Sequence, residues 1–196
     1  MTLSTTFILA SQSPRRRDLL DHVGVDFAVH VSPANEEIPP DAPPEDAVRE
    51  IARQKARPVA REFPTALTLA ADTVVVHDGD LLTKPRDPDH ARAMLRRLRG
   101  TTHAVTTGLA LQHPDSGRRV TAAETTDVSF GTISDDDIAA YVETGSPMDK
   151  AGGYGIQDPT APLFIDGIHG DYYNVVGLPL RRLYLLLRNH FGDFLV

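Results

Sequence analysis

The chain of 196 residues contains no cysteine and no long run of apolar residues. Without cysteine it has no disulfide bonds, no thiolate metal ligands and no cysteine nucleophile, although neither redox compartment is excluded. No apolar run reaches the roughly 18 residues that a membrane-spanning helix requires, so no membrane partner is predicted. The first residues also lack the basic segment of a signal peptide, and a cytoplasmic location is therefore expected.

An excess of basic charge is also absent, since the net charge is −7 at pH 7. Nucleic-acid-binding domains usually carry a basic surface, so no nucleic-acid partner is predicted. A small anionic substrate is still compatible with this charge, because a local cationic pocket decides its binding. The length and the apolar content of 41% suit a single domain over residues 1–196 with a buried core.

Lysine is scarce, because 17 of the 20 basic residues are arginine. The three lysines, Lys55, Lys84 and Lys150, therefore indicate positions at which arginine does not serve. A lysine ammonium approaches a phosphate oxygen or a carboxylate as a compact point charge, whereas arginine presents a planar fork. This pattern favours an enzyme that handles phosphate. The alternative is that three surface lysines were retained by chance.

Apolar periodicity and turn residues predict alternating helices and strands. Ser13 before Pro14 indicates a helix N-cap, and Asp78 with Gly79 indicates a hairpin turn. Predicted helices cover residues 14–23, 45–61, 88–99, 134–143 and 179–190; predicted strands cover 7–10, 26–31, 66–76, 103–111, 119–130 and 163–168; residues 32–44 and 144–162 are predicted loops. The sequence therefore predicts an α/β fold with a mixed, twisted sheet and flanking helices.

The first candidate site follows the first predicted strand, where residues 11–17 read SQSPRRR. A strand that turns directly into a helix N-terminus offers free backbone N–H groups and a positive dipole end to an anion. The hydroxyl of Ser11 and the guanidinium groups of Arg15 and Arg16 would complete a cradle for a polyphosphate. The alternative is an ordinary capped helix with a solvated basic turn.

The second candidate is Asp72, a single carboxylate within the apolar strand 66–76. An ionised carboxylate there is costly unless it is paired or binds a metal ion. The position suits a general base or a Mg²⁺ ligand beside a phosphate pocket, and Glu36 and Glu37 offer further carboxylate oxygens. The alternatives are a structural aspartate bonded to backbone and a solvated acidic loop.

The third candidate is the glycine-rich segment 149–157, which reads DKAGGYGIQ. Glycines let backbone approach a ligand closely, but such a loop is weak evidence because a flexible connector has the same composition. The histidines lack the spacing of a zinc site, and His103 is expected to be a surface or core polar residue.

Several motifs in order along the chain resemble the Maf family. They are residues 9–20 (LASQSPRRRDLL), 71–75 (ADTVV), 84–85 (KP), 149–157 (DKAGGYGIQ) and 174–180 (NVVGLPL). The resemblance implies a nucleoside triphosphate pyrophosphatase, which cleaves between the α- and β-phosphates to give a monophosphate and pyrophosphate. It also implies a fold similar to inosine triphosphatases, with two lobes around a central cleft, and a divalent metal, Mg²⁺ or Mn²⁺.

Within that family the chain is similar to the subgroup that prefers dTTP and UTP, and modified pyrimidine nucleotides are compatible with it. The resemblance rests on Arg15 after Ser-Pro, Thr73 after the catalytic aspartate, and Gln157 at the end of the glycine-rich motif. One position departs from the family. Ser146 stands where the family usually has glutamate, which removes an acid next to the Asp-Lys pair.

The resemblance and the residues together imply a division of roles. The expected substrate-binding and specificity residues are Ser11, Arg15, Arg16, Lys55, Thr73, Lys84, Lys150 and Gln157. Asp72 is the expected catalytic base and also a metal ligand, together with Glu36 or Glu37. Two other functions stay open: a nucleotide sensor without catalysis, which has little need of Asp72, and a purine-preferring pyrophosphatase, against which Thr73 and Gln157 weigh. A homodimer is also left open.

Overall fold

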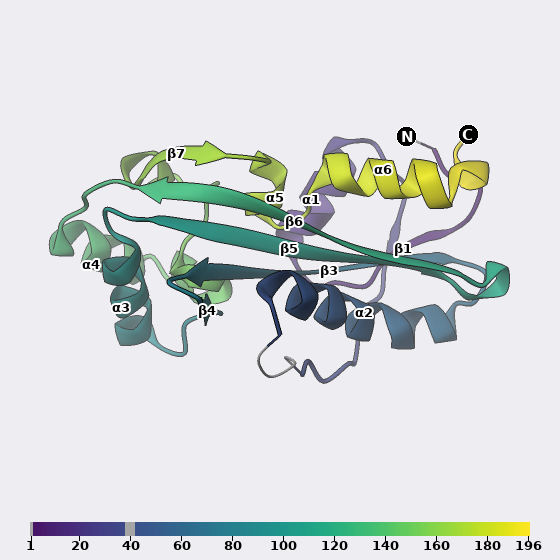
Figure 1. Ribbon diagram of the computed structural model, residues 1–196, viewed down its shortest axis with the longest axis horizontal. Helices are drawn as coiled ribbons and strands as arrows, with labels where there is room; N and C mark the ends of the chain where they lie inside the picture. The colour runs from purple at the N-terminus through teal and green to yellow at the C-terminus, as the bar shows by residue number, and fades with distance from the viewer. Residues whose placement is uncertain (1, 38–41) are drawn as a thin grey trace. The chain divides into compact units, whose positions relative to one another are not determined.

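The computed structural model describes residues 2–37 and 42–196. It has a seven-stranded sheet in the order β2-β1-β3-β5-β6-β7, with β4 paired to β3 (Figure 1). The strands are β1 (Phe7–Leu9), β2 (Ala28–Val29), β3 (Leu67–His77), β4 (Asp80–Leu82), β5 (Thr102–His113), β6 (Arg118–Phe130) and β7 (Ile165–His169). Because β1 is parallel to β2 and β3 whereas β4 and β7 pair antiparallel, the predicted mixed sheet is confirmed.

In chain order, the α-helices of the described residues follow the first strand and lie between and after the others. They are α1 (Pro14–His22), α2 (Pro44–Glu62), α3 (Pro88–Leu98), α4 (Asp135–Glu143), α5 (Tyr172–Val176) and α6 (Leu180–His190). The chain divides into two compact units. Unit 1 comprises Met1–Asp72, Thr107–Glu124 and Gly177–Val196, and unit 2 comprises Thr73–Thr106 and Thr125–Val176.

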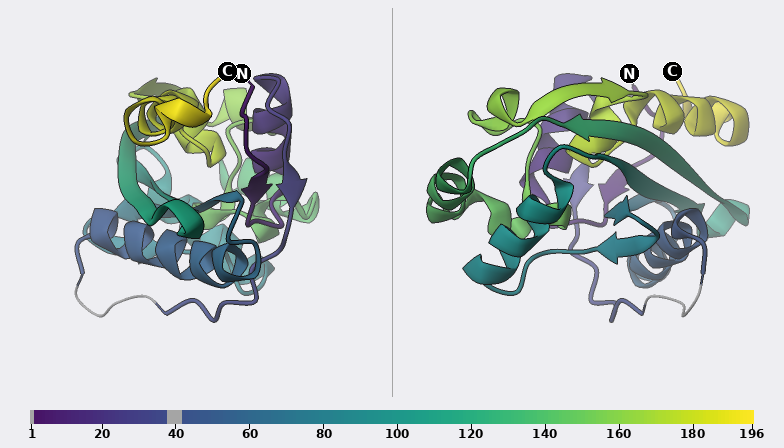
Figure 2. Two further views of the ribbon diagram at one scale, coloured as in Figure 1. Left: turned by 90° about the vertical axis from the view of Figure 1, so that its right-hand side faces the viewer. Right: turned by 60° about the vertical axis from the view of Figure 1, so that its left-hand side comes forward.

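In unit 1, α2 lies along one face of the strands and α6 along the other (Figures 1 and 2). The α2 face is closely packed at Gly108, where an added Cβ would lie 2.2 Å from the carbonyl oxygen of Val48. Small residues continue this contact, since Ala52, Ala56 and Ala110 share one buried cluster. The close approach fixes α2, and with it the side chains that α2 presents to the strands.

In unit 2, α3 and α4 lie side by side and cover one apolar core (Figure 1). This core contains an aromatic group in which the ring of Phe130 meets those of His103 and Tyr154 edge to face. His103 Nε2 and the Tyr154 hydroxyl are 2.7 Å apart, so a buried hydrogen bond ties β5 to the glycine-rich segment. His103 is therefore the core polar residue that the sequence allowed.

Most local predictions are confirmed within one or two residues, including the hairpin turn, where Asp78 and Gly79 both have positive φ. Ser13 occupies the predicted N-cap position before Pro14, but its side chain makes no capping hydrogen bond, and its own N–H donates to Ser11 Oγ. The strand predicted over 26–31 is reduced to β2, and α5 was not predicted. The loop prediction for 32–44 falls partly on residues 38–41, which lie outside the described residues.

The described chain has no helix that combines the length and the apolar character needed to cross a membrane.

Candidate active site

Three predicted site residues of unit 1 meet at one ammonium group. Lys55, on the strand-facing side of α2, places its Nζ 2.6 Å from Asp72 Oδ1 and 3.0 Å from Glu36 Oε1. The side chains of Lys55 and Asp72 are each only 15% exposed, whereas that of Glu36 is 50% exposed. A cation held between two carboxylates on the border of the core is the pairing that the buried strand position of Asp72 requires.

A second group of contacts joins the start of α1 to the segment before α6. The Nε of Arg16 donates to the carbonyl oxygen of Gly177 at 2.8 Å, and its Nη1 donates to Ser11 Oγ at 3.2 Å. Ser11 is buried, and its Oγ also accepts the N–H of Ser13 at 3.2 Å. These bonds hold the side chain of Arg16 in a fixed orientation beside the first turn of α1.

The two groups act on each other electrostatically. Burial lowers the pKa of Arg16, the nearby carboxylates of Asp72 and Glu36 oppose that shift, and the charge of Arg15 adds to it. The cluster thus brings three cations, Arg15, Arg16 and Lys55, together with two carboxylates. Its excess of positive charge fits an anionic ligand such as a phosphate chain.

The residues of this cluster fit a divalent metal that is shared with a substrate. Among the described residues, no group of three or more His, Cys, Asp or Glu side chains is arranged to hold a metal ion. However, Mg²⁺ commonly takes only one or two carboxylates from a protein and completes its coordination with water and substrate phosphates. The side chains of Asp72 and Glu36 converge on one point and meet that requirement.

Glu37 is placed differently from Glu36. Its backbone N–H donates to Gln54 Oε1 at 3.0 Å, and its carbonyl oxygen accepts from Gln54 Nε2 at 3.1 Å. This two-point contact with α2 fixes the backbone of the loop next to Glu36. The geometry therefore favours Glu36 as the carboxylate at the cluster and Glu37 as the anchor of its loop.

The other predicted site residues belong to unit 2. Thr73 directly follows Asp72 in β3, and Lys84 is exposed just after β4, before the buried Pro85. Lys150 and Gln157 lie near the two ends of the glycine-rich segment. Neither Lys84 nor Gln157 has a hydrogen bond or ion pair with another described residue, and both are exposed. Their amine and amide groups are available to a ligand.

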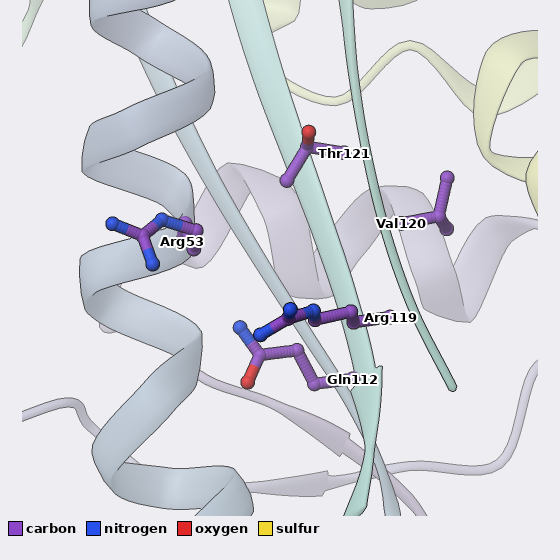
Figure 3. A pocket seen from close by; sticks show the side chains of 5 residues that line it. All are labelled: Arg53, Gln112, Arg119, Val120 and Thr121. Carbon is purple, nitrogen blue, oxygen red and sulfur yellow. The ribbon is translucent and has the colours of Figure 1, made fainter. Parts of the chain in front are cut away.

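A pocket of about 240 Å³ in unit 1 contains none of the predicted site residues. It is lined by Arg53 of α2, Gln112 of β5, and Arg119, Val120 and Thr121 of β6 (Figure 3). The guanidinium of Arg53 is occupied by Glu50, which accepts two hydrogen bonds of 2.7 Å. The candidate site is thus the carboxylate and cation cluster around Lys55 and not this pocket.

Comparison with known proteins decides the family. The sequence profile of the family described as Maf-like protein matches residues 6–190. The chain belongs to the Maf family. A Maf relative from Salinibacter ruber, named dTTP/UTP pyrophosphatase, is 62% identical over 195 residues, which are 100% of this chain and 96% of the relative. One of the same name from Symbiobacterium thermophilum is 49% identical over 92% of this chain and 91% of its own length.

Solved structures with a related backbone arrangement are more distant. A HAM1 protein from Coxiella burnetii aligns with 93% of this Maf chain and 98% of its own, at 15% identity and a TM-score of 0.48. The Ham1 protein of Staphylococcus aureus aligns with 64% of this chain and 71% of its own, at 12% identity and a TM-score of 0.46. Both TM-scores are below 0.5, so the family assignment rests on sequence.

Sequence reasoning missed one polar network of this Maf chain, which surrounds Lys150 in unit 2. Asp158 Oδ2 accepts hydrogen bonds from Tyr141 at 2.5 Å and from Ser146 at 2.7 Å, and it lies 3.7 Å from Lys150 Nζ. Asp158 directly follows Gln157 in a segment that reads as a polar turn, so its sequence gave no sign of burial. The one available signal was the loss of an acid at Ser146.

Proposed function

We propose that this protein hydrolyses dTTP and UTP to the nucleoside monophosphate and pyrophosphate. The observation that carries the proposal is the pairing of Asp72 and Glu36 through Lys55, next to Arg16, in a chain of the Maf family. Relatives that share up to 62% of the sequence are named dTTP/UTP pyrophosphatase, which supports the same substrates here. Modified pyrimidine triphosphates belong to the same proposal.

Substrate binding uses the cations first. Arg15 and Lys84 donate to phosphate oxygens, and the N-terminal turn of α1 adds backbone N–H groups from a helix end. Lys55 exchanges its contact with Asp72 for a contact with a phosphate oxygen. This exchange frees an oxygen of Asp72. Arg16, held by Ser11 and by the carbonyl of Gly177, keeps its positive charge beside the phosphates without moving.

In the chemical step, Asp72 accepts a proton from the attacking water as general base. The water oxygen bonds to the α-phosphorus, the bond from that phosphorus to the bridging oxygen breaks, and pyrophosphate leaves with the bridging oxygen and both electrons. The cations already in place offset the charge that develops on the phosphoryl oxygens, and this positioning supplies most of the acceleration. A bound Mg²⁺ or Mn²⁺, held by Asp72 and Glu36, would supply additional charge neutralisation at the phosphates.

Base choice is assigned to Gln157, together with Arg15 and Thr73. An amide offers one acceptor and two donor hydrogens, which suits the O2, N3–H and O4 edge of uracil or thymine. In the structure Gln157 is exposed, with its amide free of other described residues. This supports a side chain that is available to read the base.

The experiment is a panel of eight ribo- and deoxynucleoside triphosphates, with Mg²⁺ or Mn²⁺, in which products are identified by chromatography. We expect dTTP and UTP to give the highest kcat/KM, with the monophosphate and pyrophosphate in equal amounts and no turnover after chelation of the metal. Release of orthophosphate with a diphosphate would contradict the proposed bond cleavage. Binding without turnover would indicate a sensor, and faster purine turnover would refute the pyrimidine assignment.

A further inference from the structure

Lys150 lies at the start of the glycine-rich segment, and its side chain is only 11% exposed. Two short 3₁₀ turns, Ser146–Asp149 and Ala151–Gly153, flank it. The aliphatic part of the side chain runs directly under Gly155, where an added Cβ would lie 2.5 Å from Lys150 Cε. Lys150 is therefore packed inside its own segment.

The ammonium group of Lys150 has no donor left for a ligand. Nζ donates to the carbonyl oxygen of Ser146 at 2.6 Å, to Ser146 Oγ at 3.0 Å and to Asp149 Oδ1 at 2.9 Å. A lysine ammonium carries three hydrogens, and these three contacts use all of them. A phosphate could gain this cation only by breaking the contacts that order the segment.

Asp158 closes the other end of the segment. Its Oδ2 accepts from Ser146 Oγ at 2.7 Å and from the Tyr141 hydroxyl at 2.5 Å, and its side chain is 14% exposed. The Tyr141 oxygen in turn accepts the backbone N–H of Gly155 at 3.0 Å. Burial, assisted by the hydrogen bond to Asp158, raises the pKa of the Tyr141 hydroxyl, so Tyr141 remains a donor.

From this geometry we infer that Asp158, through Ser146, Tyr141 and Lys150, is a positioning residue that fixes the backbone carrying Gln157 and thereby sets the base preference. The inference rests on the proposed function, because it assigns base reading to Gln157. Asp158 directly follows Gln157 and supplies a second carboxylate near Lys150 besides that of Asp149, whereas residue 146 contributes its hydroxyl and its backbone carbonyl oxygen. Lys150 thus belongs to the support of the segment rather than to the phosphate site.

The test compares Asp158→Asn, Tyr141→Phe and the double variant Ser146→Glu/Asp158→Asn, with Asp136→Asn as a matched control. Asp136 is an exposed aspartate of α4. Each protein is assayed for kcat and KM with UTP and with GTP. Exchange of the Gly155 amide hydrogen with solvent is measured by NMR, which reports the order of the segment without any substrate.

For Asp158→Asn we expect the UTP-to-GTP ratio of kcat/KM to fall roughly tenfold, about the effect of losing one charged hydrogen bond. The loss should lie mainly in KM for UTP, and the Gly155 amide should exchange at least about tenfold faster. Tyr141→Phe should speed the exchange as well and lower the ratio. Glutamate at position 146 can reach Lys150 directly, so the double variant should recover most of the ratio and of the protection.

The outcomes separate this inference from the proposed function. A wild-type protein that turns over neither UTP nor dTTP refutes the proposed function, while the exchange data still report whether Asp158 orders the segment. If the wild type prefers UTP and Asp158→Asn keeps that preference, the positioning role is refuted. If Asp158→Asn lowers kcat/KM equally for UTP and GTP, and the double variant restores neither, then Asp158 contributes only to the general stability of the protein. That result also overturns the inference. If Asp158→Asn does not fold, Tyr141→Phe and the double variant test the positioning role with the same two measurements.

Discussion

Replacing Asp72 by asparagine removes the charge from the carboxylate that lies 2.6 Å from the Lys55 ammonium nitrogen. Asparagine has nearly the same shape, and its carbonyl oxygen still accepts a hydrogen bond from Lys55. The variant loses the ability to take a proton from water at neutral pH, and it also loses one of the two carboxylates proposed to hold a metal. The change therefore tests the chemistry with little alteration of the packing.

The structural cost of Asp72→Asn should be small. Removing one partner of a buried ion pair can cost about 3–5 kcal/mol, because the other charge is left unpaired. Here Lys55 retains Glu36 at 3.0 Å and a neutral acceptor at position 72. We therefore expect a loss of about 1–2 kcal/mol in the free energy of unfolding, at or below the roughly 1.5–3 kcal/mol of a complete hydrogen bond to a charged group. A domain with an ordinary stability of about 5–15 kcal/mol remains folded after this loss.

The catalytic cost should be much larger. A general base contributes roughly 10²- to 10⁴-fold to the rate, and removal of a metal ligand adds to that loss. We expect kcat for UTP to fall at least about 10²-fold, which corresponds to roughly 2.7 kcal/mol in the activation free energy. KM should change much less, because Arg15, Arg16 and Lys84 remain.

The assay measures pyrophosphate release under steady-state conditions, with urea unfolding of each protein in parallel. The matched control is Asp26→Asn, which changes an exposed aspartate of unit 1 outside the proposed site. Asp26→Asn should change neither kcat nor the free energy of unfolding appreciably. A kcat for Asp72→Asn within roughly threefold of the wild-type value, with folding intact, would show that Asp72 is structural and would refute the mechanism. A raised KM with unchanged kcat would assign it to binding alone.

Four further outcomes follow from the same geometry. Glu36→Gln should raise the Mg²⁺ concentration needed for half-maximal activity several-fold more than Glu37→Gln does; equal effects in a metal titration would refute the assignment of Glu36. Lys84→Ala should lower kcat/KM roughly 10- to 150-fold, the value of one charged hydrogen bond, and full recovery in Lys84→Arg would contradict the argument from lysine scarcity. Gln157→Glu should lower kcat/KM for UTP by about 1–3 kcal/mol and lower that for GTP less, and an unchanged ratio would place base choice elsewhere. Burial lowers the pKa of His103 to about 4, below its unfolded value of about 6.5, so its stabilising effect is present above pH 6.5 and is lost as pH falls toward 4; urea unfolding should show this slope in the wild type and a weaker one in His103→Phe, and identical slopes would contradict it.

The sequence alone determined the order and type of the main elements. Apolar periodicity located α2 and β3, and turn residues located the β3–β4 hairpin, because these features depend on neighbours a few residues apart. The scarcity of lysine directed attention to Lys55 and Lys150, and both lie partly buried beside carboxylates. Motif order along the chain also indicated the family that the comparison established.

Only the tertiary structure decided what each charged group touches. Lys55, Asp72 and Glu36 are far apart in sequence, and they meet because the close contact of α2 at Gly108 sets the face that α2 presents to the strands. Distances of this kind depend on packing between elements, and no local pattern records them.

The same limit applies to individual hydrogen bonds. Ser13 carries the sequence signature of an N-cap, yet its side chain makes no capping bond. The sequence predicts Lys150 as a phosphate-binding residue, yet Ser146 and Asp149 accept all three hydrogens of its ammonium group. A sequence supplies the donors and acceptors, but competition among partners within hydrogen-bond distance selects the bonds, and the folded backbone alone determines which partners are within that distance.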